Sequence, residues 1–156
     1  MYFERGGVDE CLSDEDLRSG LLQALRALDE IELRSKVFII PPDFTRFHSK
    51  AGVLTACAYE YYGQDRVSGI MPALGTHQPM TEDQLKRMFG GGIPLSKFLI
   101  HDWRNDVVTI GTVPASLVYA ASDGKANEPW PAQLNKHLWE GNHDLVLSIG
   151  QVVPHE

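Results

Sequence analysis

The residue types best suited to chemistry gather where a short apolar run gives way to a polar segment. Val37–Ile40 is too short and too apolar for anything but a buried strand, and a helical pattern starts directly after the polar segment. The turn between them offers a carboxylate, two hydroxyls, a guanidinium and an imidazole, on Asp43, Thr45, Arg46, His48 and Ser49. Ligands of open α/β sheets bind at such turns, and the start of the next helix favours an anion.

Three further predicted strands also end in polar residues. Ser68–Leu74 runs into Thr76 and His77, Phe98–Ile100 into His101 and Asp102, and Asp144–Ile149 into a tail that closes with His155 and Glu156. In a parallel, doubly wound sheet these four ends lie along one edge. Because a hydrophobic core does not require that placement, it predicts a binding or catalytic site at this edge.

Taken singly, each of these residues also has a purely structural interpretation. The planar fork of Arg46 suits a carboxylate or a phosphate, but the same side chain could pair with Asp43 at the surface. His77 follows a glycine that allows a tight turn, and a backbone carbonyl could satisfy its ring. Adjacent residues on an extended chain point to opposite sides, so His101 and Asp102 are not expected to pair directly.

The elements that would position these residues alternate between helix and strand. Ser13 predicts the N-cap of an amphipathic helix over Leu17–Leu28, and Leu54–Tyr61 has helical spacing that stops at Gly63. Thr81 and Gln84 form a capping box for a third helix, which ends at the glycines 90–92. Val107–Ile110 is expected to be a short strand, residues 122–131 a loop, and residues 134–139 are ambiguous.

This alternation predicts an α/β fold: a layered, mostly parallel sheet with helices on both faces, Rossmann-like. Residues 1–12 are expected to be a loose lead-in, and residues 13–156 a single domain. The net charge of −7 and the lack of a basic run argue against nucleic acid or an anionic membrane as partner. Two isolated cysteines fit a reducing cytoplasm.

Several standard sites are excluded by pattern. No paired CxxC, HExxH or EF-hand spacing occurs, so no self-contained zinc or calcium site is expected, and no complete metal-ligand set is visible. The phosphate-binding glycine loops and the GxSxG turn of serine hydrolases are also absent.

Four segments together resemble one family. PPDFTRFHS is similar to the D-x-T-R motif of the nickel-dependent lactate racemases, and LGTHQPMTEDQL is similar to their G-T-H segment. IGQVVPHE resembles their G-x-V-x-P-H motif, and IHDWR falls where members often carry a His-Asp pair. The segments come in the family's order and cover most of residues 37–156.

The resemblance implies the N-terminal α/β domain of a two-domain enzyme that interconverts the enantiomers or epimers of a 2-hydroxy acid. It implies a nickel pincer nucleotide as cofactor, tethered to a lysine, which takes hydride from the substrate. The implied acid/base residues are His77 and His155, with Arg46 holding the substrate carboxylate. Asp43 and Thr45 would shape the cofactor pocket, and the supporting residues would be Thr76, His101 and Asp102.

The chain also departs from the family. The cofactor lysine and a nickel-coordinating histidine come after the P-H motif in the family, beyond Glu156, so we expect this polypeptide alone to be inactive and to need a C-terminal domain as partner. The residues around the P-H motif differ from those expected in the lactate enzymes, so the sequence does not identify which 2-hydroxy acid is the substrate. Two other interpretations remain: a non-catalytic α/β module that binds an anionic small molecule, and a folded piece whose exposed face docks a partner domain.

Overall fold

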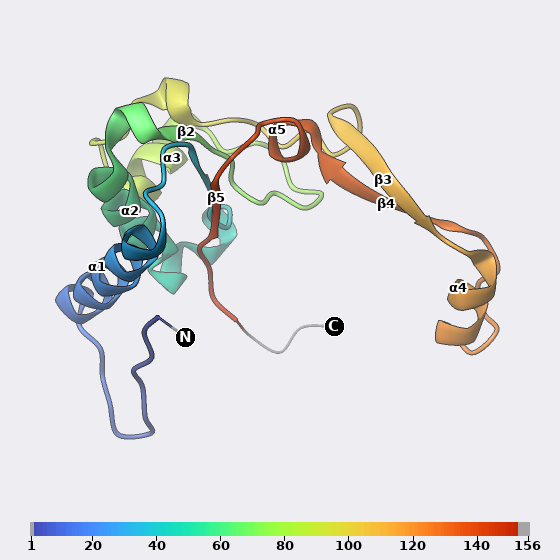
Figure 1. Cartoon of the computed structure of the whole chain (residues 1–156), viewed down its shortest axis with the longest axis horizontal. Helices are drawn as coiled ribbons and strands as arrows, with labels where there is room; N and C mark the ends of the chain where they lie inside the picture. Colours follow the sequence, from blue (N-terminus) through green and yellow to red (C-terminus); the bar gives the residue numbers. More distant parts are fainter. Residues whose placement is uncertain (1, 153–156) are drawn as a thin grey trace. The chain divides into compact units, whose positions relative to one another are not determined.

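The computed structural model describes residues 2–152 of the chain. The chain divides into two compact units: Met1–His101 together with His143–Glu156, and Asp102–Asn142. Figure 1 shows the course of the chain and the labels of its elements. Residues 2–13 form neither helix nor strand.

The first unit is built on a parallel three-stranded sheet in the order β2-β1-β5. The central strand β1 (Val37–Ile40) pairs with β2 (Val67–Ile70) on one side and with β5 (Leu145–Ser148) on the other. All three strands therefore point their carboxyl ends the same way. The sheet and its helices confirm the α/β class, and the predicted strands at Val37–Ile40 and Asp144–Ile149 are confirmed.

Helix α1 (Asp14–Ile31) begins where the sequence predicts it. The Ser13 hydroxyl accepts a hydrogen bond from the Asp16 N–H, and the Asp16 carboxylate accepts one from the Ser13 N–H, which closes a capping box. The buried side of α1 is centred on Leu25, which is 1% exposed. This cap fixes the start of the helix by satisfying backbone donors that the helix itself leaves free.

Helix α2 (Ala51–Arg66) follows the polar turn after β1, which forms a short 3-10 helix, η1 (Phe44–Ser49). Its second residue, Gly52, lies so close to the next helix that a Cβ there would clash with the Met88 carbonyl oxygen. The helix does not stop at Gly63 as expected. Gly63 adopts a positive φ of 75° and interrupts the helical geometry, and the helical turns resume up to Arg66.

The core of this unit lies on the side of β1 that carries Val37 and Ile39. These side chains pack with residues of both long helices and of the neighbouring strands, and the cluster includes Leu25, Ala58, Tyr59, Tyr62, Val67, Ile70, Met88, Phe89 and Ile93. The opposite side carries Phe38, whose ring stacks on His143 at a centroid distance of 4.6 Å. His143 therefore packs on the sheet and is half-buried.

After β2 the chain stays extended, then enters helix α3 (Glu82–Phe89), which has the predicted capping box between Thr81 and Gln84. A short 3-10 helix, η2 (Leu95–Lys97), follows. The strand predicted at Phe98–Ile100 is wrong, since this segment makes a single parallel bridge, Ile70 to Phe98. The physical reason is Pro72, which has no N–H with which to continue the ladder after Leu99 donates to Ile70.

The second unit contains an antiparallel ribbon. Strand β3 (Val107–Val113) pairs with β4 (Trp130–Asn135), helix α4 (Ala115–Ala121) lies between them in the chain, and α5 (Lys136–Trp139) follows. The predicted strand at Val107–Ile110 is confirmed and extends further, whereas β4 was not foreseen. Among the described residues, every buried hydrophobic side chain of the core belongs to the first unit.

Across the described residues, no helix is both long enough and apolar enough to cross a membrane.

Candidate active site

The polar turn after β1 is organised by the carboxylate of Asp43. Asp43 caps η1, and its Oδ1 accepts hydrogen bonds from the Thr45 N–H at 3.1 Å and from the Thr45 hydroxyl. The residue is only 6% exposed, which is unusual for a carboxylate that, within residues 2–152, makes no ion pair with a lysine or arginine. Such a buried charge persists because hydrogen bonds replace its water.

The second oxygen of Asp43 reaches across to the turn that follows β2. Oδ2 lies 2.6 Å from the Nδ1 atom of His77, 34 positions further along the chain. The His77 N–H donates to the Leu74 carbonyl at 2.9 Å, and Gly75 takes a φ of +55° to make that turn. Parallel pairing of β1 with β2 brings the two turns together, so the contact follows from the topology that the sequence predicted.

The electrostatics of the pair fix which nitrogen carries the proton. Burial raises the pKa of Asp43, but the hydrogen bonds from Thr45 and His77 outweigh burial and hold that pKa below its ordinary value of 3.8. An ionised carboxylate only accepts hydrogen bonds, so Nδ1 of His77 must donate. In the neutral imidazole the lone pair is then on Nε2, and the His77 side chain is 58% exposed. The arrangement suits a general base whose ring is oriented by a buried carboxylate.

Arg46 lies three residues after Asp43 in η1, and its N–H donates to the Asp43 carbonyl at 3.1 Å. The Asp43 carboxylate forms its contacts with His77 and Thr45, so the alternative in which Asp43 pairs with Arg46 is wrong. Within residues 2–152 the Arg46 guanidinium makes no ion pair. The Arg46 backbone and the His77 ring thus both contact Asp43, and the guanidinium of Arg46 is available to bind an anion.

The residues predicted to support the site have different surroundings. Thr76 is exposed in the turn that carries His77. Asp102 accepts hydrogen bonds from the Arg104 and Asn105 N–H groups and from the Asn105 side chain, so it holds the turn that begins the second unit. His101 is half-buried and is the last residue of the first unit before that turn. His155, predicted as the second acid/base, lies outside the described residues.

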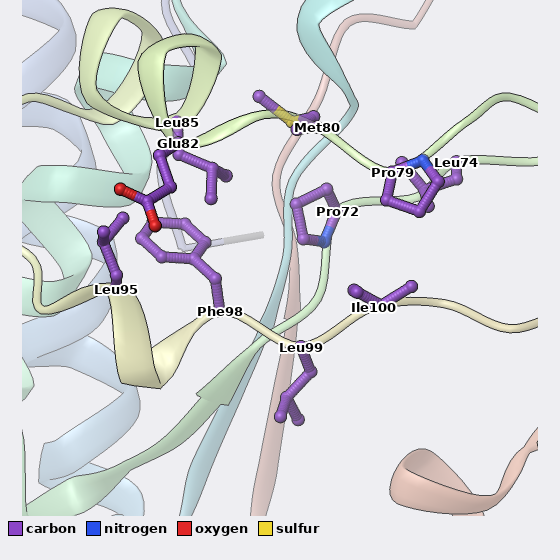
Figure 2. Close-up of a pocket in the computed structure, with 10 residues that line it drawn as sticks. All are labelled: Pro72, Leu74, Pro79, Met80, Glu82, Leu85, Leu95, Phe98, Leu99 and Ile100. Carbon is purple, nitrogen blue, oxygen red and sulfur yellow. The ribbon is translucent and has the colours of Figure 1, made fainter.

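An apolar pocket adjoins the turn that bears His77. Leu74 and Pro79, which flank residues 75–78, form part of its wall, and the cavity has a volume of about 200 Å³. Figure 2 shows these two side chains next to each other at one side of the pocket, with Phe98 at the other. The remaining lining residues are Pro72, Met80, Glu82, Leu85, Leu95, Leu99 and Ile100.

The described part of the site does not by itself form a metal-ligand set. Among residues 2–152, the His, Cys, Asp and Glu side chains do not gather in groups of three or more that could hold a metal ion. Both oxygens of the Asp43 carboxylate and one ring nitrogen of His77 are already engaged with each other or with Thr45. The groups that these contacts leave over are Nε2 of His77 and the Arg46 guanidinium, which can accept a proton and bind an anion.

The fold and this geometry define a class: an α/β domain with a carboxylate-held histidine and an arginine at the carboxyl edge of a parallel sheet. The comparison with protein families is more specific. A family model described as the lactate racemase N-terminal domain matches residues 21–156. The chain belongs to that family, as the four motifs predicted. No curated protein matches the chain.

Sequence reasoning missed two features of the site. The direct contact between Asp43 and His77 was not predicted, although both residues follow strands that were expected to be parallel neighbours. The apolar pocket gave no signal at all, because Pro79, Met80 and Ile100 have the composition of any loop or core segment. Only the fold brings them together in one pocket.

Proposed function

We propose that this chain is the part of a lactate-racemase-type enzyme that binds a 2-hydroxy acid and moves the proton of its hydroxyl group. The observation that carries the proposal is the 2.6 Å contact between Asp43 Oδ2 and His77 Nδ1. It leaves Nε2 of an exposed imidazole as the proton acceptor, and Arg46, in the turn after β1, makes no ion pair in the described part of the chain. The membership in the lactate racemase family supports the choice of substrate class.

In the proposed reaction, Arg46 holds the substrate carboxylate, by the bidentate pairing that a guanidinium makes with carboxylates. His77 Nε2 accepts the hydroxyl proton, and the resulting imidazolium is stabilised by the Asp43 carboxylate on the other side of the ring. Loss of that proton and of hydride from Cα converts the hydroxy acid into a planar keto acid. Return of hydride and proton from the other face gives the opposite configuration.

The cofactor, proposed from the family to be a nickel pincer nucleotide, supplies the hydride acceptor when it is bound. We propose that its attachment lysine and its nickel-ligating histidine come from outside these 156 residues. His155 is proposed as the second acid/base, for the enantiomer that presents its hydroxyl from the other side. Asp43, with both oxygens engaged, is proposed to position His77, and Thr45 to hold Asp43.

Two variants test the proposal in an enzyme that joins this chain to a C-terminal domain of the family. His77→Ala should remove most racemase turnover and leave binding of the 2-hydroxy acid within a few fold, since general-base catalysis contributes about 10²–10⁴-fold. Arg46→Ala should instead weaken binding. Full racemisation by the His77→Ala enzyme would contradict the proposal.

A second function is favoured by one observation, the Arg46 guanidinium that has no ion pair within the described residues. A non-catalytic module that captures an anionic small molecule would need that group and nothing from His77. In that case Arg46→Ala abolishes binding, and neither the chain nor the joined enzyme turns over a hydroxy acid.

A further inference from the structure

The apolar pocket adjoins the turn that bears His77. Leu74, in the pocket wall, accepts the backbone hydrogen bond from His77 at 2.9 Å, and Pro79 returns the chain to the pocket on the other side of the turn. Figure 2 shows Leu74 and Pro79 together at this side of the pocket. The turn of His77 is therefore joined to the pocket wall at both of its ends.

We infer that this pocket selects the substrate, and that the substrate is a 2-hydroxy acid with a branched aliphatic or phenyl side chain in place of the methyl group of lactate. This inference rests on the proposed function and adds the substrate class to it. The occupant is argued from three properties of the pocket: its position beside His77, its size and its lining.

The size of the pocket exceeds what a methyl group fills. The cavity measures about 200 Å³. For comparison, a dry protein cavity of about 150 Å³ lined by aliphatic and aromatic residues binds benzene. A lactate methyl would leave most of this space to water against apolar walls, whereas an isobutyl or benzyl group would fill it.

The lining favours an uncharged, apolar side chain. Nine of the ten described residues that line the pocket are Pro, Leu, Met, Phe or Ile. The one charged member is Glu82, whose side chain is 72% exposed and lies 3.5 Å from the Lys86 amine. No lysine, arginine or histidine is among the described lining residues, so the second carboxylate of a dicarboxylic hydroxy acid would meet no cation there and one anion.

The experiment is calorimetric titration of the full chain with three acids: lactate, 2-hydroxy-4-methylpentanoate and malate. Three additional buried carbons at about 0.8 kcal/mol each correspond to roughly fiftyfold in affinity, and partial burial in an open pocket reduces that to about tenfold. We expect 2-hydroxy-4-methylpentanoate to bind about tenfold more tightly than lactate, and malate no more tightly than lactate.

A variant then connects the preference to the pocket. Ile100 lines the pocket and is 60% exposed, so Ile100→Trp should fill the space without disturbing the core. It should remove the tenfold advantage of 2-hydroxy-4-methylpentanoate over lactate. Ile31→Trp is the matched control, at the end of α1 and 67% exposed, and should keep the preference. If Ile100→Trp proves misfolded by its thermal transition, Met80→Trp, from another segment of the wall, replaces it.

Each outcome has a definite consequence. Equal affinity for lactate and the larger acid, or an undiminished preference for the larger acid in Ile100→Trp, overturns the inference and leaves the proposed function standing. Tighter binding of malate also overturns it. If none of the three acids binds, the proposed function fails, and the inference fails with it.

Discussion

Replacing Asp43 by asparagine tests the proposed acid–base pair with almost no change in shape. The substitution Asp43→Asn removes the negative charge and places a neutral amide opposite Nδ1 of His77, where the carboxylate oxygen lay at 2.6 Å. With its oxygen turned to Thr45, the amide can still accept from the Thr45 N–H and hydroxyl, and its N–H₂ group then faces the ring. An amide N–H₂ facing the ring requires Nδ1 to accept, which moves the ring proton to Nε2.

The size of the effect follows from what the substitution removes. In a serine-protease triad the same change fixes the wrong histidine tautomer and lowers kcat about 10⁴-fold. A loss of about 10³–10⁴-fold in racemase turnover is therefore expected if His77 is the base. The loss of stability should be small, about 1 kcal/mol, because the Thr45 contacts survive and the His77 side chain is largely exposed. That corresponds to a fall in Tm of about 2–4 °C for a chain of this length.

The direct assay is the tautomer itself. Nitrogen-15 NMR of the histidine rings distinguishes a protonated from an unprotonated ring nitrogen without any need for turnover. The wild-type protein, measured where His77 is neutral, should show the proton on Nδ1, and Asp43→Asn should show it on Nε2. Asp123→Asn removes the same charge from an exposed residue with a φ of +51°, a conformation that asparagine adopts readily, and should leave the His77 signals unchanged.

Two results would refute this reasoning. A wild-type protein with the His77 proton on Nε2 would mean that Asp43 does not act as the acceptor for Nδ1. Undiminished turnover by an Asp43→Asn enzyme with a changed tautomer would mean that His77 is not the base.

Three further predictions concern stability. Gly52→Ala should destabilise the protein by about 1–3 kcal/mol in chemical denaturation, because the new Cβ would clash with the Met88 carbonyl oxygen. Gly91→Ala, where a Cβ would meet nothing within 4 Å, should be tolerated. Equal effects of the two substitutions would contradict this packing. The folded-state pKa of Asp43 is lowered, so its contribution to the free energy of unfolding is present above pH 3.8 and is lost as the pH falls through the folded pKa. The difference in stability between wild type and Asp43→Asn should therefore shrink in acid and stay constant near neutrality. Asp144→Ala should cost about 1–3 kcal/mol, because this carboxylate accepts hydrogen bonds from two backbone amides just before β1, and an unchanged denaturation midpoint would count against that role.

Local signals in the sequence predicted most of the elements that position the site. Ser13 and Thr81 cap helices where their side chains can accept the free N–H groups of a first turn, and the structure has both capping boxes. The run at Val37–Ile40 was correctly interpreted as a buried strand, because four consecutive apolar residues between turn signals fit a parallel sheet covered on both sides. Such features depend on a few neighbouring residues, which is why one sequence suffices for them.

Features that depend on distant pairing were harder to foresee. Strand β4 carries Pro131, Gln133 and Asn135, a composition that does not suggest a strand, and it exists because β3 pairs with it. The failure at Phe98–Ile100 has the opposite cause: the segment itself suits a strand, but its neighbour offers Pro72 where a donor is needed. The site shows the same limit, since the sequence placed Asp43 and His77 at one edge but could not pair them.

The central claim is tested most directly by titrating the protein, with its histidine rings isotopically labelled, with lactate and in parallel with propionate. The two acids share the carboxylate and the carbon chain, and propionate lacks the hydroxyl. If Arg46 binds the carboxylate and Nε2 of His77 accepts from the hydroxyl, lactate should shift the ring signals of His77 strongly and propionate should shift them little, while Arg46→Ala should abolish both responses. Saturable lactate binding that leaves the His77 signals unmoved would contradict the account.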